Sequence, residues 1–402
     1  MQRWTLRNGM KLVYVMKPSD SVALQILVNV GSNHETAPVR GISHFIEHAV
    51  FEGTKKRKNA KDIANAIERV GGDLNAYTTN HRTCFYVKVL QKHFGVGLDV
   101  LADILQDPLF RKEDVERQKN ILFKEIDLVT DDPRSHQWVL FEKALFIKHP
   151  SKYPVAGTHA SVRGISARDI QNYFSHHYFP KNMVLSVVGN VRGVKEKVER
   201  AFFAREGNVA HKTFSEPLQK KNRVKKEKRK GVANTYLVLG HRTVSRSHPD
   251  SYVLDVIDGI LGRGQSGWMF DEIRNKAGLA YEVGTQHVAE IDCGFFATYA
   301  SIDKKNFGRV RAMVLKELER LYSVSENDVC EAQTFLEGDF LLEHEDTQKL
   351  ADQVAFWEQV KHADLYHNYV KKINAVSAQD VRRIARKYFS KPYAMAMIEG
   401  KK

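Results

Sequence analysis

The sequence is poor in cysteine and in proline. Only three cysteines occur among its 402 residues, and they are odd in number and far apart: Cys84, Cys293 and Cys330. We expect three reduced thiols, because neither a disulfide framework nor a cysteine-based metal site fits this spacing. The 10 prolines and 25 glycines are too few for a collagen-like or largely disordered chain. The composition therefore favours a globular protein with a substantial core.

Long apolar segments are also missing. No run approaches the roughly 20 residues that a transmembrane helix requires, and Gln25 and Asn29 interrupt the stretch from Val22 to Val30. The first 15 residues are typical of a strand, a turn and a second strand, without the apolar region of a signal peptide. The sequence predicts a protein without membrane association and with a cytoplasmic location.

Basic residues outnumber acidic ones. Lys and Arg total 62 against 48 Asp and Glu, which gives a net charge of +14. Half of the excess lies between residues 220 and 230, where eight basic residues stand beside one acid, Glu227. Because apolar periodicity is missing from 206–230, we predict a basic linker there. Nucleic acid is disfavoured as a partner, because no aromatic residue is interleaved among these charges to stack on bases.

Two segments of the chain, 162–191 and 373–402, form an internal repeat. In each copy a serine that can cap a helix is followed three residues later by an aspartate, and the helix leads to a Tyr-Phe pair and then a strand. The paired residues are Ser166 and Asp169 in the first copy, and Ser377 and Asp380 in the second. The copies lie 211 positions apart, which predicts two homologous domains.

Helices and strands alternate without the regular spacing of βαβ units. We therefore predict an α+β fold with two homologous sandwich-like domains, each an antiparallel sheet packed with helices. The predicted boundaries are 1–205 for the N-terminal domain, 206–230 for the linker and 231–402 for the C-terminal domain.

One segment, from Gly41 to Thr54, carries a metal-binding pattern. In a helix its apolar residues would form a buried stripe, whereas His44, Glu47 and His48 fall on the other face. Two imidazoles one turn apart can bind one tetrahedral zinc ion, and the carboxylate beside them can reach a bound water molecule. The alternative is a chance match to H-x-x-E-H, which is expected in on the order of a few per cent of chains of this size.

A third ligand is expected on a second helix, from Asp114 to Leu128. Gln118, Leu122 and Glu125 lie on one face of that helix, and Glu125 is the residue that we select as the third protein ligand. Taken by itself, Glu125 would more often be a solvated carboxylate on a helix surface.

These segments together resemble the M16 (pitrilysin-like) zinc metallopeptidases, in particular the bacterial and archaeal members of this length that are related to the mitochondrial processing peptidase. The resemblance extends over essentially the whole chain and rests on residues 6–12, 44–54, 71–78, 121–126 and 131–133. It implies that His44, His48 and Glu125 bind one zinc ion per chain. It also implies that Glu47 is the general base of an endopeptidase that hydrolyses short or unfolded peptides with metal-activated water.

The resemblance implies substrate contacts as well. Asn75 and Ala76 would lie on an edge strand beside the zinc, where a peptide can add through main-chain hydrogen bonds. Arg274 and Tyr281 would hold the substrate from across a chamber that the two domains enclose. Without the resemblance, Asn75 is equally well a turn residue at a strand entry, and Arg274 and Tyr281 are a helix-surface charge and a packed aromatic.

Some relatives form heterodimers in which one chain keeps the zinc motif and the other keeps the Arg/Tyr pair. Because this chain has both, the resemblance implies a self-sufficient protease that forms a homodimer; a non-catalytic or partner-dependent peptide-binding subunit of a heterodimer is the alternative. Two residues depart from the family pattern, since Gln118 and His81 each replace a common glutamate. Gln118 would still hydrogen-bond behind the ligands. The basic charge favours neutral or acidic peptides over strongly cationic ones.

Overall fold

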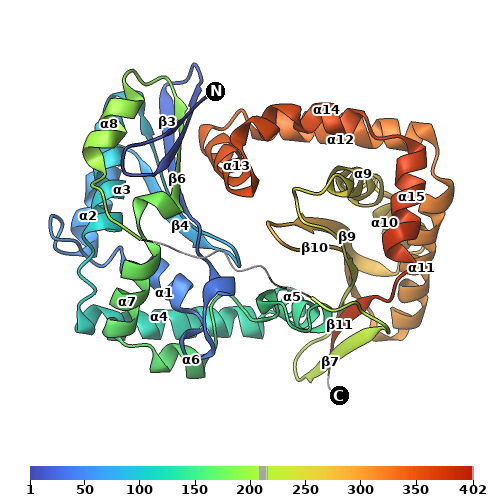
Figure 1. The fold of residues 1–402 in the computed structure, drawn as a ribbon. Coiled ribbons are helices and arrows are strands. Elements are labelled where there is room, and N and C mark those ends of the chain that lie inside the picture. Colours follow the sequence, from blue (N-terminus) through green and yellow to red (C-terminus); the bar gives the residue numbers. More distant parts are fainter. Residues whose placement is uncertain (208–213, 215, 401–402) are drawn as a thin grey trace. The chain divides into compact units, whose positions relative to one another are not determined.

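The computed structural model describes residues 1–207, 214 and 216–400, and it divides into two compact units (Figure 1). Each unit is built from three separate stretches of the chain. The first comprises Met1–Asp127, Pro154–Lys212 and Leu342–Tyr366, and the second comprises Leu128–Tyr153, Thr213–Leu341 and His367–Lys402. These units cross the domain boundaries that the sequence predicts at residues 205 and 231.

The first unit contains a six-stranded sheet. In spatial order its strands are β1 (Gln2–Thr5), β2 (Lys11–Met16), β6 (Met183–Gly189), β3 (Ser21–Val28), β5 (Thr83–Leu90) and β4 (Asp73–Thr78). β2 and β6 run parallel, and all other neighbours are antiparallel. β6 is buried along its whole length, which explains its nearly continuous apolar sequence. β4 is the last strand in the order and so lies at an edge of the sheet.

The second unit contains a five-stranded sheet with the same topology. Its strands are β7 (Arg223–Arg229), β11 (Ala394–Gly400), β8 (Thr235–Arg242), β10 (Gly294–Ile302) and β9 (Ala280–Ala289). β7 and β11 run parallel and the rest antiparallel, as do β2, β6, β3, β5 and β4 in the first sheet. The predicted duplication is confirmed. The predicted antiparallel sheets are confirmed except for one parallel pair in each, β2 with β6 and β7 with β11. The long, helix-containing connection from β2 to β6 lets the chain return in the same direction.

Both repeated helices begin at the predicted caps. The hydroxyl of Ser166 accepts the backbone N–H of Asp169 at 3.2 Å, while the carboxylate of Asp169 accepts the N–H of Ser166 at 2.8 Å. Ser377 and Asp380 form the same reciprocal pair in the second copy. The two helices are α7 (Ala167–His177) and α15 (Ala378–Phe389).

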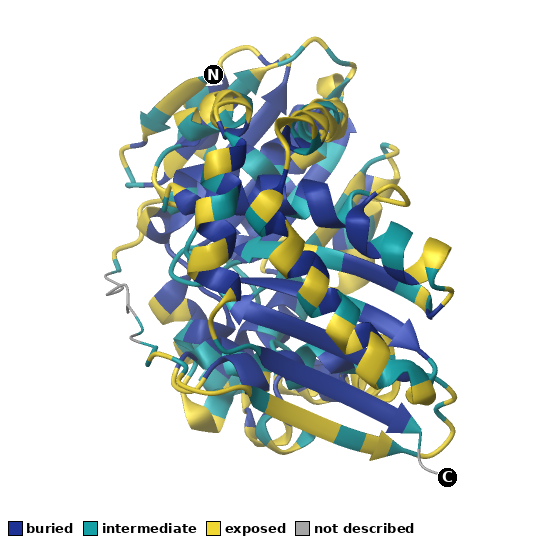
Figure 2. Cartoon of the chain, turned by 90° about the vertical axis from the view of Figure 1, so that its right-hand side faces the viewer, coloured by how far each residue is buried: buried dark blue, intermediate teal, exposed yellow. Residues whose placement is uncertain are grey.

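Part of the predicted basic linker is a strand. Arg223–Arg229 forms β7, which pairs with β11 over its full length, so the linker prediction was wrong for these residues. The strand was missed because it lies at a sheet edge with largely solvated faces and carries no apolar alternation; Figure 2 shows it mostly in yellow and teal beside dark blue strands. Charges on an edge strand also hinder pairing with other chains. Linker residues 208–213 and 215 lie outside the described residues.

Each sheet is covered by a helix from the opposite half of the chain. α13 (Thr347–Val360) packs on β3 and β6 of the first sheet, and α5 (Pro133–Leu145) packs on β8 and β11 of the second. α13 contributes Leu350, Ala351, Val354 and Ala355 to a cluster with Val13, Ala23, Leu27, Cys84, Val184 and Val188. The first unit therefore needs residues from the C-terminal half for its core.

Truncating Leu350 to Ala should destabilise the first unit, although this residue is far from it in sequence. The side chain is buried against the sheet, and Leu-to-Ala changes at such sites cost roughly 2–3 kcal/mol in the free energy of unfolding, at the lower end of the range for full burial. The measurement is urea unfolding followed by the fluorescence of a residue in the first unit. Leu341→Ala, on the surface of α12 (Glu326–Glu343), is the control and should cost less than about 0.5 kcal/mol. Equal losses of stability in the two variants would contradict the packing of α13 on the first sheet.

The remaining helices surround the two sheets. In the first unit they include α1 (Ile42–Ala49), α2 (Ala60–Glu68), α3 (Phe94–Gln106), most of α4 (Lys112–Asp131) and α8 (Val194–Ala201). In the second unit they include α9 (Asp250–Gly262), α11 (Phe307–Arg320) and α14 (Tyr369–Asn374). Among the helices described, none has the length and the apolar character needed to cross a membrane.

Candidate metal centre

The predicted metal-binding pattern lies on α1, and the predicted buried stripe is confirmed. Ile42, Phe45 and Ile46 are at most 1% exposed and belong to the core of the first unit. His44 and His48 lie on the other side of the helix, with their ring centroids 4.8 Å apart. The local fold follows from the sequence, because the apolar residues recur at helical spacing and leave the polar ones on one face.

α4 brings Glu125 to these two histidines. The Oε2 atom of Glu125 lies 3.5 Å from Nε2 of His44 and 3.4 Å from Nε2 of His48. Two ligands about 2.1 Å from a tetrahedral ion are about 3.4 Å apart, so this spacing fits a single zinc ion. The structure thus brings together the three residues that were predicted as ligands, although 76 residues separate Glu125 from His48 in sequence.

The protonation state of the first histidine also suits a metal. Burial, with a smaller contribution from the nearby His48, lowers the pKa of His44 to about 4. The ring is therefore neutral at neutral pH, with a nitrogen lone pair available to a cation. Two imidazoles and one carboxylate form the donor set of many catalytic zinc sites, which keep a fourth position for water or substrate.

Glu47 lies beside His44 and His48, two of the predicted ligands, and is only 9% exposed. Burial raises its pKa to about 7, the hydrogen bond from Thr78 opposes this shift, and the nearby charge of Glu125 adds to it. A cation bound alongside would favour the charged form of the carboxyl. A carboxyl group with a pKa near the working pH can act as a general base.

Thr78 is a site residue to which sequence reasoning gave no role. It is the last residue of β4, and its hydroxyl donates a hydrogen bond to Oε2 of Glu47. It was noticed only as the end of a family motif. The available signal was its place at the end of the predicted edge strand, next to the metal-binding helix.

Gln118 connects α4 to the segment that follows α1, and these two helices carry the predicted ligands. Its side-chain amide donates to a carboxylate oxygen of Glu52, which follows α1 by three residues, and Arg117 binds the other oxygen. α4 is thereby tied to the segment after α1, which helps to hold Glu125 near the histidines. The sequence predicts that Gln118 hydrogen-bonds behind the ligands; the structure shows its hydrogen bond to Glu52, and its supporting role stays a prediction.

The predicted peptide-binding pair lies on β4, at the edge of the first sheet. Asn75 is exposed and Ala76 is half-buried, and the side-chain oxygen of Asn75 accepts the N–H of Ala76 at 2.8 Å. Because Thr78 of the same strand contacts Glu47, this sheet edge leads directly to the candidate metal centre. His81 is buried in the turn after β4, with Nε2 3.4 Å from the amide nitrogen of Asn33.

The predicted Arg/Tyr pair lies in the second unit. Arg274 is part of a π-helical turn, Asp271–Lys276, and its guanidinium stacks over the ring of Phe270 at 4.7 Å. Tyr281 lies at the start of β9 with 64% of its surface exposed. Both side chains are exposed, as contact with a substrate requires, and their role remains a prediction.

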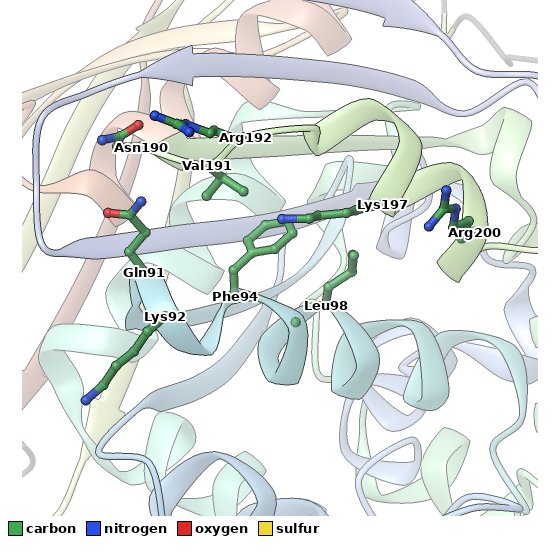
Figure 3. A pocket seen from close by; sticks show the side chains of 10 residues that line it. Gln91, Lys92, Phe94, Leu98, Asn190, Val191, Arg192, Lys197 and Arg200 are labelled. Atoms are coloured by element: carbon green, nitrogen blue, oxygen red, sulfur yellow. The ribbon is translucent and has the colours of Figure 1, made fainter.

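A cavity of about 680 Å³ lies away from the metal-binding pattern, between α3 and α8 of the first unit (Figure 3). Its lining is basic and apolar, and consists of Gln91, Lys92, Phe94, Gly95, Leu98, Asn190, Val191, Arg192, Lys197 and Arg200. Because none of the predicted site residues lines this cavity, it is not the candidate metal centre.

Comparisons with known proteins show the family of this chain. Residues 11–159 match the family model described as insulinase (peptidase family M16), and residues 164–336 match that of the peptidase M16 inactive domain. An uncharacterized zinc protease from Bacillus subtilis is 30% identical over 405 residues, which cover 99% of this chain and 98% of the relative. The chain belongs to peptidase family M16. An uncharacterized zinc protease from Mycobacterium bovis is 31% identical over 410 residues, with 99% of the M16 chain and 92% of the relative covered.

Solved structures show the same fold. A protease from Helicobacter pylori superimposes with a TM-score of 0.93 at 22% identity, and 99% of each chain is covered. A peptidase M16 inactive domain from Pseudomonas fluorescens gives a TM-score of 0.89 at 17% identity, covering 100% of the M16 chain and 98% of the neighbour. The two family models match successive parts of the chain, and the metal-binding pattern lies in the part that matches the first of them.

Proposed function

We propose that this M16 chain is a zinc-dependent endopeptidase that cleaves short or unfolded peptides. One observation carries the proposal: a carboxylate oxygen of Glu125 lies within 3.5 Å of both imidazole nitrogens on α1, with the buried carboxyl of Glu47 beside them. His44, His48 and Glu125 would hold one zinc ion per chain.

Catalysis is assigned to Glu47. When bound, zinc supplies a Lewis acid that polarises the peptide carbonyl and lowers the pKa of water. Glu47 accepts a proton from the attacking water and returns it to the leaving amine. Because Oε2 already accepts the Thr78 hydroxyl, Oε1 is the oxygen that we assign to this transfer.

Substrate binding is assigned to both units. The peptide backbone pairs with the outer edge of β4 at Asn75 and Ala76, which selects an extended chain rather than a sequence. Arg274 offers forked donors to a peptide carbonyl and Tyr281 offers a phenol. The net charge of +14 favours neutral or acidic peptides. We further propose a homodimer.

The purified single protein tests this proposal. Zinc content should be one per chain, and a quenched fluorescent peptide should be cleaved until a chelator is added, with recovery on adding Zn²⁺. Protein that holds no zinc, and that cleaves peptide only after a related chain is added, would instead identify a partner-dependent subunit.

Removing the hydroxyl of Thr78 should slow catalysis without loss of zinc. Thr78→Val leaves Glu47 without its hydrogen bond, and a hydrogen bond to a charged group contributes roughly 1.5–3 kcal/mol, so we expect kcat to fall about tenfold or more. Thr78→Ser keeps the hydroxyl and should stay within about threefold of the wild type. Steady-state kinetics with zinc content measured in parallel decides the matter; equal kcat values for the Val and Ser variants would rule out this role.

A further inference from the structure

The helix that carries the metal-binding pattern begins without a capping side chain. Gly41 occupies the N-cap position of α1 with a φ of 94°, and it makes no side-chain cap. A Cβ atom at this position would lie 2.7 Å from the carbonyl oxygen of Ala156, so the close backbone approach requires glycine. The first N–H groups of the helix must therefore find acceptors elsewhere.

Glu35 supplies those acceptors from outside the helix. Its Oε2 atom accepts the backbone N–H of Gly41 at 2.7 Å, and its Oε1 atom accepts the N–H of Ser43 at 2.9 Å. A carboxylate here also interacts favourably with the positive end of the helix dipole. A residue six positions before the N-cap Gly41 thus takes the role of a capping side chain.

We propose that Glu35 is a positioning residue for the metal centre, which holds the first turn of α1 so that His44 and His48 face one ion. This inference rests on the proposed zinc site. His44 lies in the first turn, next to Ser43, whereas His48 lies in the last turn of this eight-residue helix. Fraying of the first turn would displace His44 and leave His48 in place. The distance from His44 to Glu125 would then exceed the 3.5 Å that suits a shared ion.

The segment that carries Glu35 is hydrogen-bonded to the turn after β4, the strand whose last residue binds Glu47. The backbone N–H groups of Ser32 and Asn33 donate to the carbonyl oxygens of Thr79 and Asn80, in the turn after β4, at 3.2 and 2.9 Å. β4 ends at Thr78, whose hydroxyl binds Glu47. One turn therefore anchors both the segment that carries Glu35 and the residue that holds Glu47.

The affinity for Zn²⁺ tests this role independently of catalysis. Burial raises the pKa of Glu35 to about 7, although its backbone hydrogen bonds oppose the shift, so affinities are measured at pH 8 by competition with a chromogenic chelator. Glu35→Ala should bind Zn²⁺ about 10- to 100-fold more weakly than the wild type, the range for residues that orient metal ligands. Glu35→Gln has the same shape and should lie in between, and it serves if the Ala variant does not fold.

A destabilised control separates positioning from loss of stability. Val198→Ala removes a buried side chain of α8 in the same unit and should lower the melting temperature without changing the affinity for Zn²⁺. Affinities of both Glu35 variants within twofold of the wild type would overturn the proposal, as would an equal loss in Val198→Ala. If the wild type binds Zn²⁺ but cleaves no peptide, the proposed function fails while this comparison still decides the role of Glu35. A wild type that binds no Zn²⁺ overturns both.

Discussion

Replacement of Glu47 by Gln is expected to lower kcat by about 10²- to 10⁴-fold and to leave one zinc ion per chain. The amide has the same shape and can still accept the Thr78 hydroxyl at its oxygen, but it cannot take a proton from water. KM should change little, because the substituted group acts on the reacting water rather than on the peptide. Steady-state kinetics and metal analysis of the same preparation provide the measurement.

His48→Ala is the matched comparison on the same helix. It removes one of the two imidazoles that lie within 3.5 Å of the Glu125 carboxylate and should therefore abolish both zinc binding and turnover. The two variants separate a base from a ligand. Loss of zinc in Glu47→Gln would show that Glu47 is itself a ligand, and full activity would show that the proton is taken elsewhere.

Replacement of Arg246 by Met is expected to destabilise the second unit by roughly 3–5 kcal/mol, since it leaves a buried carboxylate without its cation. Arg246 forms a two-pronged pair with Asp255 of α9, at 2.6 and 3.1 Å. Nδ1 of His287 on β9 lies 2.7 Å from Asp255, and the hydroxyl of Tyr369 on α14 donates to Asp255 at 3.2 Å. The Asp255 carboxylate therefore links α9 to β9 and to α14.

The same ion pair predicts the acid dependence of stability. Burial by itself would raise the pKa of Asp255, but Arg246 and His287 outweigh it and hold the pKa well below its usual value. A carboxyl with a lowered folded-state pKa contributes its full stabilisation above the unfolded value of about 4, and this is lost as the pH falls through the folded value.

Denaturant unfolding, repeated between neutral and acidic pH, measures both effects. The double variant Arg246→Met with Asp255→Leu should recover much of the stability lost by the single variant, because no uncompensated charge remains. Arg309→Met, an exposed arginine on α11, is the control and should change stability by less than about 0.5 kcal/mol. A loss below 1 kcal/mol in Arg246→Met would contradict the account of this network.

Local features of the fold could be predicted from the sequence, whereas long-range pairing could not. The serine caps at Ser166 and Ser377 were predictable, because both residues of a capping box lie within four positions of the sequence. β7 could not be predicted, because an edge strand rich in lysine lacks the alternation of apolar and polar residues that identifies half-buried strands. The packing of α5 and α13 on sheets from the other half of the chain could not be predicted either, since the sequence of a helix does not specify the sheet that it covers.

In the candidate site, too, the local relations could be predicted from the sequence and the long-range contacts could not. His44, Glu47 and His48 lie on one helix, so their relation follows from helical geometry alone. Glu125 was predicted from its spacing in the sequence and from the family resemblance. Its position beside the histidines depends on how α4 packs. Glu35, Glu52 and Thr78 act through contacts between segments that are apart in the chain. The missing capping residue before α1 was the signal that could have pointed to Glu35.

The most direct test of the central claim is digestion of a mixed peptide library by the zinc-loaded protein, read by mass spectrometry and compared with Glu47→Gln at equal zinc content. We expect internal cleavages with the wild type, favouring neutral or acidic peptides, and essentially none with the variant. Identical product patterns from the two proteins would contradict the assignment of this site to peptide hydrolysis.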